Sequence, residues 1–200
     1  MLNPIQGQLF SSPLREQILC GFSELSNVEK KSDSPKFVIA HLMIPHQPYV
    51  FGPNGEPLFP KILTLEDKKE PENQDLYLGQ LQFANIRIKD VIEKLTETEN
   101  PPIIIIQSDH GGRVFEYENK YEDLLNRYNN FKAYYFPGEG KNIEFEKTTP
   151  VNSFRVLFNL LFDDEYELLE DRIYWEPLTL NKTKSVGDVT DILINNNSEN

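Results

Sequence analysis

The chain has 200 residues, enough for one domain with a hydrophobic core, and we expect that domain to cover residues 1–180. Its net charge of −12, from 32 acidic and 20 basic residues, argues against nucleic acids and anionic membrane surfaces as partners. The hydrophobic content of 38% excludes general disorder, and the single cysteine excludes an intramolecular disulfide. The sequence shows no secretory signal and no run of about 20 apolar residues that could span a bilayer, so we expect this chain by itself to be soluble.

The first predicted element is a helix from Pro13 to Lys30, with Ser12 as its N-cap and Pro13 at its first position. Cys20 lies within this apolar pattern, so we expect it to be a small buried core residue. The apolar side chains recur at helical spacing, at Leu14, Ile18, Leu19, Phe22 and Leu25.

A strand is predicted next, from Phe37 to Leu42, where apolar and β-branched residues predominate. Pro45 and Pro48 then force the chain out of regular structure. The resulting loop carries His46 between the two prolines, and His41 lies five residues before it. Each histidine taken singly is more often structural than functional.

The second long helix is predicted from Leu76 to Leu95, with Asp75 as its cap. The loop that precedes it, from Gln47 to about Pro71, is long enough to be functional.

The most informative stretch follows, because four isoleucines from Ile103 to Ile106 predict a strand buried on both faces. The strand is followed closely by Asp109 and His110, which precede two glycines. Ligand sites in open α/β sheets lie beyond the carboxyl ends of strands, and carboxylate and imidazole groups are metal ligands. The alternative is a helix-capping aspartate beside a surface histidine.

The remaining elements alternate between helix and strand, which predicts a three-layer α/β/α sandwich with a mostly parallel sheet. The acidic run that begins at Asp163 lacks the spacing of a calcium loop, so we expect a solvated edge. Residues 181–200 are polar and predict a disordered tail. The predicted elements are helices at 121–128 and 151–162 and strands at 131–136 and 173–175.

Four motifs in order resemble the sulfatase-like branch of the alkaline phosphatase superfamily, in particular membrane-anchored proteins similar to lipoteichoic acid synthases. The first is His-x-x-x-Pro-His-x-Pro-Tyr-x-Phe from His41 to Phe51, and the second is Gln-x-Asp-His-Gly from Gln107 to Gly111. The third is Ala-Tyr-Tyr-x-Pro-Gly from Ala133 to Gly138, and the fourth is Thr-Pro-Val-Asn-x-Phe-Arg from Thr149 to Arg155.

The resemblance implies a role for individual residues. Asp109 and His110 match two ligands of a divalent metal, which could be zinc, manganese, magnesium or calcium. His46 matches the histidine that contacts the phosphate or sulfate oxygens of the substrate and takes part in catalysis. His41 is a weaker candidate for substrate binding, or else a core or supporting residue. Arg155 is expected to bridge to a carboxylate or a loop carbonyl, with direct anion contact as the alternative.

The resemblance also implies what this chain leaves out. Such enzymes draw a nucleophile and an acidic metal ligand from the first half of the domain, and neither has a match here; Cys20 lacks the Cys-x-Pro-x-Arg context of a sulfatase nucleophile. We therefore expect an incomplete sulfatase-like fold that acts on phosphate or sulfate esters only with an N-terminal half or an upstream membrane-anchored subunit. Its place would then be the extracytoplasmic face of a membrane. The rival hypothesis is a non-catalytic remnant that binds or scaffolds.

Overall fold

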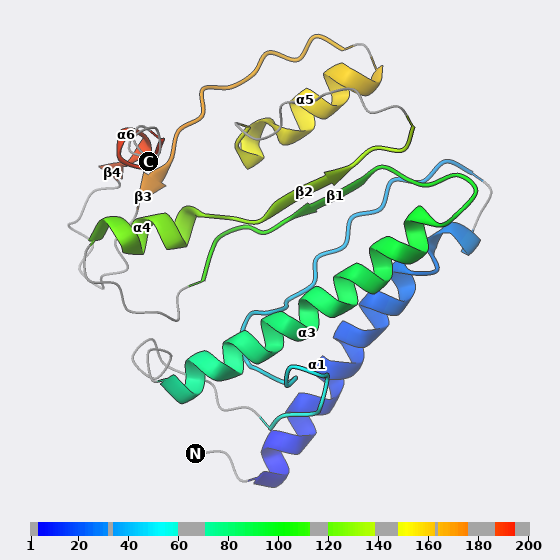
Figure 1. Cartoon of the computed structure of the whole chain (residues 1–200), viewed down its shortest axis with the longest axis vertical. Coiled ribbons are helices and arrows are strands. Elements are labelled where there is room, and N and C mark those ends of the chain that lie inside the picture. Colours follow the sequence, from blue (N-terminus) through cyan, green and yellow to red (C-terminus); the bar gives the residue numbers. More distant parts are fainter. Residues whose placement is uncertain are drawn as a thin grey trace. The chain divides into compact units, whose positions relative to one another are not determined.

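The structure is a computed structural model that describes residues 4–31, 34–59, 71–112, 120–138, 148–162, 164–175 and 187–194 (Figure 1). It divides into two compact units. The first is Met1–Ile105 with Gly112–Glu116 and Ala133–Pro137, and the second is Ile106–Gly111, Tyr117–Lys132 and Gly138–Asn200. None of the helices that the structure describes is long and apolar enough to cross a membrane.

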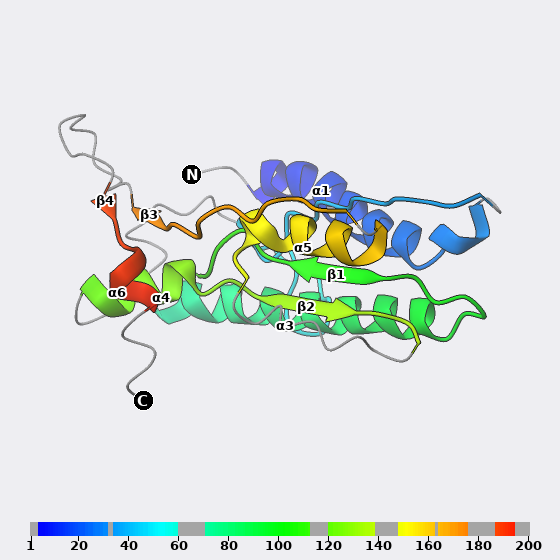
Figure 2. The same cartoon turned by 90° about the horizontal axis from the view of Figure 1, so that it is seen from above.

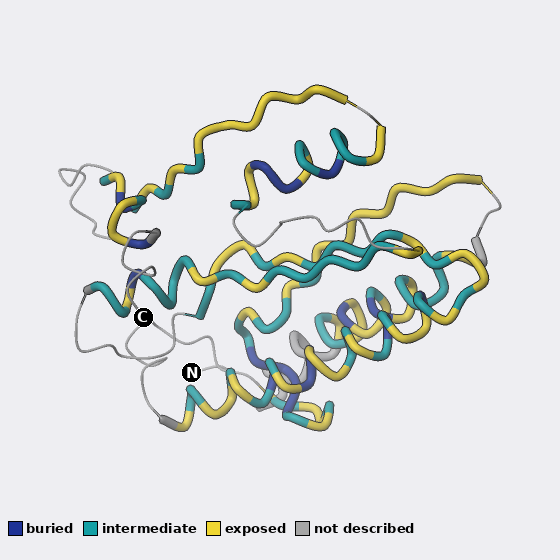
Figure 3. Tube along the Cα trace, turned by 45° about the horizontal axis from the view of Figure 1, so that its top comes forward, coloured by how far each residue is buried: buried dark blue, intermediate teal, exposed yellow. Residues whose placement is uncertain are grey.

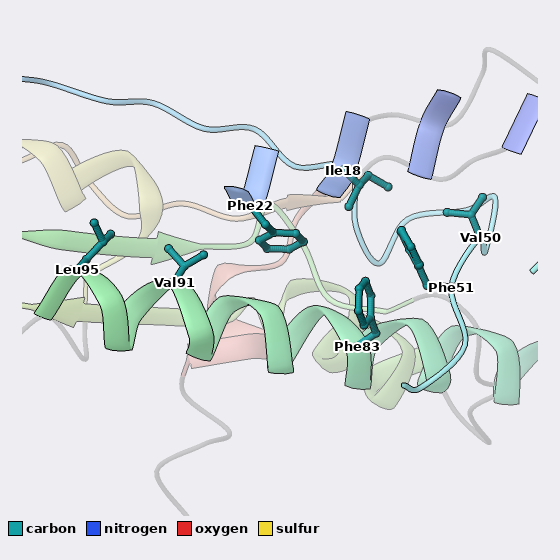
Figure 4. Packing of buried hydrophobic residues seen from close by; sticks show 7 residues of the cluster. All are labelled: Ile18, Phe22, Val50, Phe51, Phe83, Val91 and Leu95. Atoms are coloured by element: carbon teal, nitrogen blue, oxygen red, sulfur yellow. The ribbon is translucent and has the colours of Figure 1, made fainter. Parts of the chain in front are cut away.

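Two long helices form the frame of the first unit: α1 (Pro4–Leu25) packs along α3 (Pro71–Thr96), as Figure 1 shows. A short 3-10 helix, η1 (Val28–Lys31), follows α1. The core between α1 and α3 combines side chains of these two helices with the segment that follows His46 (Figure 4). Its buried members are Ile18, Phe22, Val50, Phe51, Phe83, Val91 and Leu95.

Both long helices begin earlier than the sequence predicts. α1 starts at Pro4, so Pro13 lies inside the helix and Ser12 is not its N-cap. A proline removes one hydrogen bond from a helix interior, yet the turns on either side continue here. α3 starts with Pro71 at its first position, where the missing N–H costs nothing, and Asp75 is therefore not its cap. Cys20 is exposed on α1, so its prediction as a core residue is wrong.

The predicted strand from Phe37 to Leu42 is not among the strands of the described residues, although the backbone there is extended. Phe37 is 70% exposed and Ile39 is 79% exposed. Figure 3 shows this segment as an exposed stretch. β-branched residues favour an extended backbone, but a strand also needs a neighbour to pair with.

The predicted parallel sheet is absent from the described residues, which contain two sheets of two strands each. β1 (Ile104–Gln107) pairs with β2 (Lys132–Tyr135). Ser108, just after β1, donates its N–H to the carbonyl of Phe131, just before β2, at 2.9 Å, so this pair is antiparallel. β3 (Tyr174–Trp175) and β4 (Gly187–Asp188) are also antiparallel. The isoleucines of β1 are half-buried because so small a sheet covers little of their surface.

The second unit contains α4 (Lys120–Tyr128), α5 (Pro150–Phe162) and α6 (Thr190–Ile194). α6 packs against α4, and Figure 2 shows the two helices side by side. Leu124 of α4 is buried against Val189 and Leu193, which lie in the part of the sequence predicted to be a disordered tail. Val189, just before α6, and Leu193 within it are four positions apart and bury one side of this segment against α4. Residues 181–186 and 195–200 lie outside the described part.

Asn152 ties the extended segment 164–171 to the start of α5. Its buried amide donates to the carbonyl of Leu169 at 2.7 Å and to Asp171 at 2.9 Å, and it accepts from the N–H of Leu169 at 2.9 Å. Thr149 also donates to Asp171. A half-buried asparagine, Asn159, makes the same two-way pairing with the backbone of Tyr166, through hydrogen bonds that are exposed to solvent. Asn152 therefore has a structural role in the second unit.

We predict that Asn152→Ala lowers the free energy of unfolding of the second unit by about 3 kcal/mol, because three hydrogen bonds of a buried amide are lost. Asn159→Ala is the matched control and should cost less than about 1 kcal/mol, since water replaces hydrogen bonds that are exposed to solvent. Urea unfolding can be followed by the fluorescence of Trp175, the sole tryptophan, which packs in this unit. Equal losses for the two variants would contradict the assignment.

Candidate functional site

The loop that carries His46 is held by a single side chain of α3, that of Gln80. The Gln80 Oε1 accepts the N–H of Val50 at 2.7 Å and the N–H of Phe51 at 3.2 Å. Its Nε2 donates to the carbonyl of His46 at 3.0 Å. Gln80 belongs to none of the sequence motifs, although a polar residue on the apolar stripe of a helix is a signal for such a role.

The chain then turns back in a tight hairpin whose shape depends on glycine. Phe51 bridges to Pro57, and Gly52 donates to the carbonyl of Glu56 at 2.8 Å. Gly55 has a φ of 86°, a conformation that favours glycine, and it lies against the ring of Phe83. This hairpin anchors the end of the His46 loop on α3.

His46 is exposed, and the peptide bonds that precede Pro45 and Pro48 on either side of it are cis. The Nδ1 atom of His46 lies 2.5 Å from the carbonyl oxygen of Gln47. A carbonyl oxygen only accepts, so Nδ1 carries a proton, and Nε2 is the ring atom that can accept a proton or contact a ligand. His41 is exposed in the extended segment, so its alternative reading as a core residue is wrong.

The loop of Asp109 and His110 is clamped between β1 and α4. Gly111 donates its N–H to the carbonyl of Arg127 near the end of α4, at 2.8 Å. Ser108 accepts the N–H of Phe131 at its Oγ, at 2.7 Å, in addition to the backbone bond described above. A Cβ atom at Gly111 would collide with the carbonyl of Asn126. The first glycine of the motif is therefore required by close packing on α4.

Asp109 and His110 present two potential ligand atoms from one turn. The His110 Nε2 lies 3.7 Å from the Asp109 Oδ2, and the Asp109 side chain is 88% exposed. The His110 Nδ1 lies 2.7 Å from the carbonyl of Gly111, which again leaves Nε2 as the ligand atom. The Asp109 Oδ1 accepts the N–H of His110 at 3.0 Å, and α4 begins only at Lys120, so the helix-capping alternative fails.

These two side chains fit a divalent metal in chemistry, as a carboxylate and a neutral imidazole. They form at most part of its ligand set, because no group of three or more metal-binding side chains occurs among the described residues. The acidic residues from 164 to 170 are exposed, as expected of a solvated edge, and Asp163 lies outside the described part.

Arg155 donates to the carbonyl of Val151 in its own helix at 3.0 Å. This bond lies within α5, so it is not the predicted bridge to a carboxylate or a loop carbonyl, and that bridge stays a prediction.

Two tyrosines of the first unit meet near the His46 loop: Tyr49 follows His46 in the chain, and Tyr77 belongs to α3. The rings of Tyr49 and Tyr77 meet edge to face with centroids 6.2 Å apart. Gly112, which belongs to the same unit, lies so close to Tyr77 that a Cβ atom there would be 3.1 Å from its hydroxyl. Burial, together with Tyr77, raises the pKa of Tyr49 to about 12. Burial also raises the pKa of Tyr77.

The elements and these two loops define an α/β protein with histidine and aspartate side chains presented at loops after extended segments. A protein-family model described as Sulfatase matches residues 12–154, which include His46, Asp109 and His110. The match covers more than half of the chain, so the chain belongs to the sulfatase family, a family of hydrolases that act on sulfate and phosphate esters. No curated protein and no solved structure matches it.

We predict that Gly111→Ala destabilises the second unit by about 3 kcal/mol, because the added methyl group overpacks against α4. Gly187→Ala is the matched control, since a Cβ atom there meets nothing within 4 Å. Thermal unfolding followed by Trp175 fluorescence would measure both variants. An alanine at 111 tolerated as well as one at 187 would contradict the packing argument.

A second prediction concerns alkaline pH and the first unit. The folded state holds the pKa of Tyr49 above its ordinary value of 10.0, so neutral Tyr49 adds to the free energy of unfolding. This contribution is complete below pH 10 and is lost as the pH rises towards about 12. Tyr49→Phe should remove part of this alkaline destabilisation. Unfolding midpoints measured from pH 8 to 12 on both chains would check it, and identical pH profiles would refute the assignment.

Proposed function

We propose that this chain supplies part of the active site of a metal-dependent hydrolase or transferase of phosphate or sulfate esters. The observation that carries the proposal is the sulfatase-family match, whose span includes His46, Asp109 and His110. The motif order further supports the branch similar to lipoteichoic acid synthases.

The protonation of the two histidine rings supports these roles. In both rings Nδ1 donates to a backbone carbonyl next to it, so the ring orientation and tautomer are set by the chain itself. At His110 this arrangement offers the Nε2 lone pair to a metal. At His46 the same arrangement lets Nε2 donate to an ester oxygen when the ring is protonated, so His46 can stabilise developing charge or assist the leaving oxygen.

Asp109 and His110 would hold the divalent metal together with ligands from elsewhere. When bound, the metal would polarise the ester oxygens and favour ionisation of the nucleophile. The metal would also offset the negative charge of the protein at the point where an anionic substrate binds.

A complementing segment, from an N-terminal half or an upstream membrane-anchored subunit, is the proposed source of the nucleophile and the remaining ligands. The support for it is the apolar surface of the extended segment before His46. Phe37, Val38, Ile39 and Met43 are all large apolar side chains left exposed. Large apolar side chains exposed on an extended segment are suited to contact an added strand from another segment.

We predict weak binding of Mn²⁺ or Zn²⁺ by this chain alone, because two side chains make an incomplete site. His110→Ala and Asp109→Asn should each weaken that binding at least about tenfold without loss of the fold, since both side chains are exposed at a loop. Calorimetry of the three chains would measure it. Asp164→Asn, on the acidic edge, is the control that should bind as the unchanged chain does.

Ester hydrolysis by the chain alone should be negligible, because no nucleophile is positioned. A panel of phosphatase, phosphodiesterase and sulfatase substrates would test the chain with and without its upstream neighbour. Robust metal-dependent turnover by the chain alone, lost in Asp109→Ala, would contradict the need for a complementing segment.

Tight metal binding that survives His110→Ala but is lost in Asp164→Asn would place the metal at the acidic edge and would contradict the proposed metal site.

A further inference from the structure

Gln80 is a buried polar residue of the first unit. Its side chain makes hydrogen bonds to the segment from His46 to Phe51. It is 0% exposed on the inner face of α3. Its neighbours on that face, Phe83 and Ala84, are apolar and buried. A buried amide in such a setting is costly unless every bond is made, so its presence needs an explanation beyond packing.

Gln80 holds both ends of the loop segment that begins at His46, the candidate catalytic residue. Its Nε2 holds the carbonyl of His46, and its Oε1 holds the N–H of Val50, so the chain between these two points is fixed at both ends. The His46 ring in turn donates to the carbonyl of Gln47, which lies within that stretch. The direction of the ring therefore depends on a backbone that Gln80 holds in place.

We propose that Gln80 is a positioning residue that orients the His46 ring through the loop backbone, an inference that rests on the proposed role of His46. Gln80 itself contacts no substrate. The chemistry explains why this residue type is needed. The loop presents two donors and one acceptor to one point, and the amide of glutamine accepts and donates from separate atoms, an oxygen and a nitrogen, at the end of one side chain. Asparagine has the same groups on a shorter stem, and an ionised glutamate has no donor.

The test uses the whole chain and measures the loop directly. Gln80→Met keeps the length and apolar volume of the side chain and removes its three hydrogen bonds. We expect hydrogen exchange at the amides of Val50 and Phe51 to become at least about tenfold faster, which corresponds to the loss of about one hydrogen bond. We also expect the ring-proton resonances of His46, assigned by their loss in His46→Gln, to shift. Gln82→Met, an exposed residue on the same helix, is the matched control and should change neither readout.

Gln80→Glu is the second variant, and it keeps the proposal falsifiable if Gln80→Met does not fold. A neutral carboxylic acid accepts and donates as an amide does, but an ionised carboxylate only accepts. The His46 resonances of Gln80→Glu should therefore match those of the unchanged chain at the same pH only when the pH is acidic enough to protonate the Glu side chain. Destabilisation alone does not move the resonance of a ring in the folded state. Ring resonances of His46 that are unchanged in folded Gln80→Met, or in Gln80→Glu at neutral pH, would overturn the proposal.

These readouts need no metal, substrate or turnover. Failure of the positioning role is therefore distinguishable from failure of the proposed function, which is judged by metal binding and hydrolysis.

Discussion

Buried backbone groups must find hydrogen-bond partners, and in this protein two side-chain amides meet that requirement where no strand does. Gln80 binds the backbone after His46 in the first unit, and Asn152 binds the backbone at Leu169 in the second. Each amide reproduces the donor and acceptor pair of a neighbouring strand. Both are buried, so neither bond is weakened by competition with water. The irregular segments after His46 and around Leu169 are held in place because Gln80 of α3 and Asn152 of α5 bind their backbones.

Two extended segments of the described residues differ in what their surfaces carry. The stretch from Phe37 to Leu42 and the stretch from 164 to 171 are both extended and largely exposed. The second is pinned by Asn152 and Asn159, whereas the first carries large apolar side chains on its surface.

The two candidate loops follow one physical design. Each is held by a helix through backbone contacts, by Gln80 of α3 in one case and by the Arg127 carbonyl of α4 in the other. Each histidine then donates Nδ1–H to a carbonyl of its own loop. Backbone contacts hold the loops while the reactive atoms remain exposed. This arrangement leaves Nε2 of His46 and of His110 accessible to a metal or an anion without any loss of loop order.

The sequence by itself determined the presence of most helices, though not of α6, and the candidate residues. Apolar spacing identified the two long helices, α4 and α5, because helical periodicity is a local property, and the motif order led to the sulfatase family. Only the tertiary structure decided the rest. Pairing in β1 and β2 is antiparallel, and Phe37–Leu42 is not among the strands of the described residues, because strand pairing depends on distant residues that no local pattern encodes. Gln80 was hidden for the same reason: its role arises from three backbone groups about 30 residues away, which come together only when α3 packs against the His46 loop.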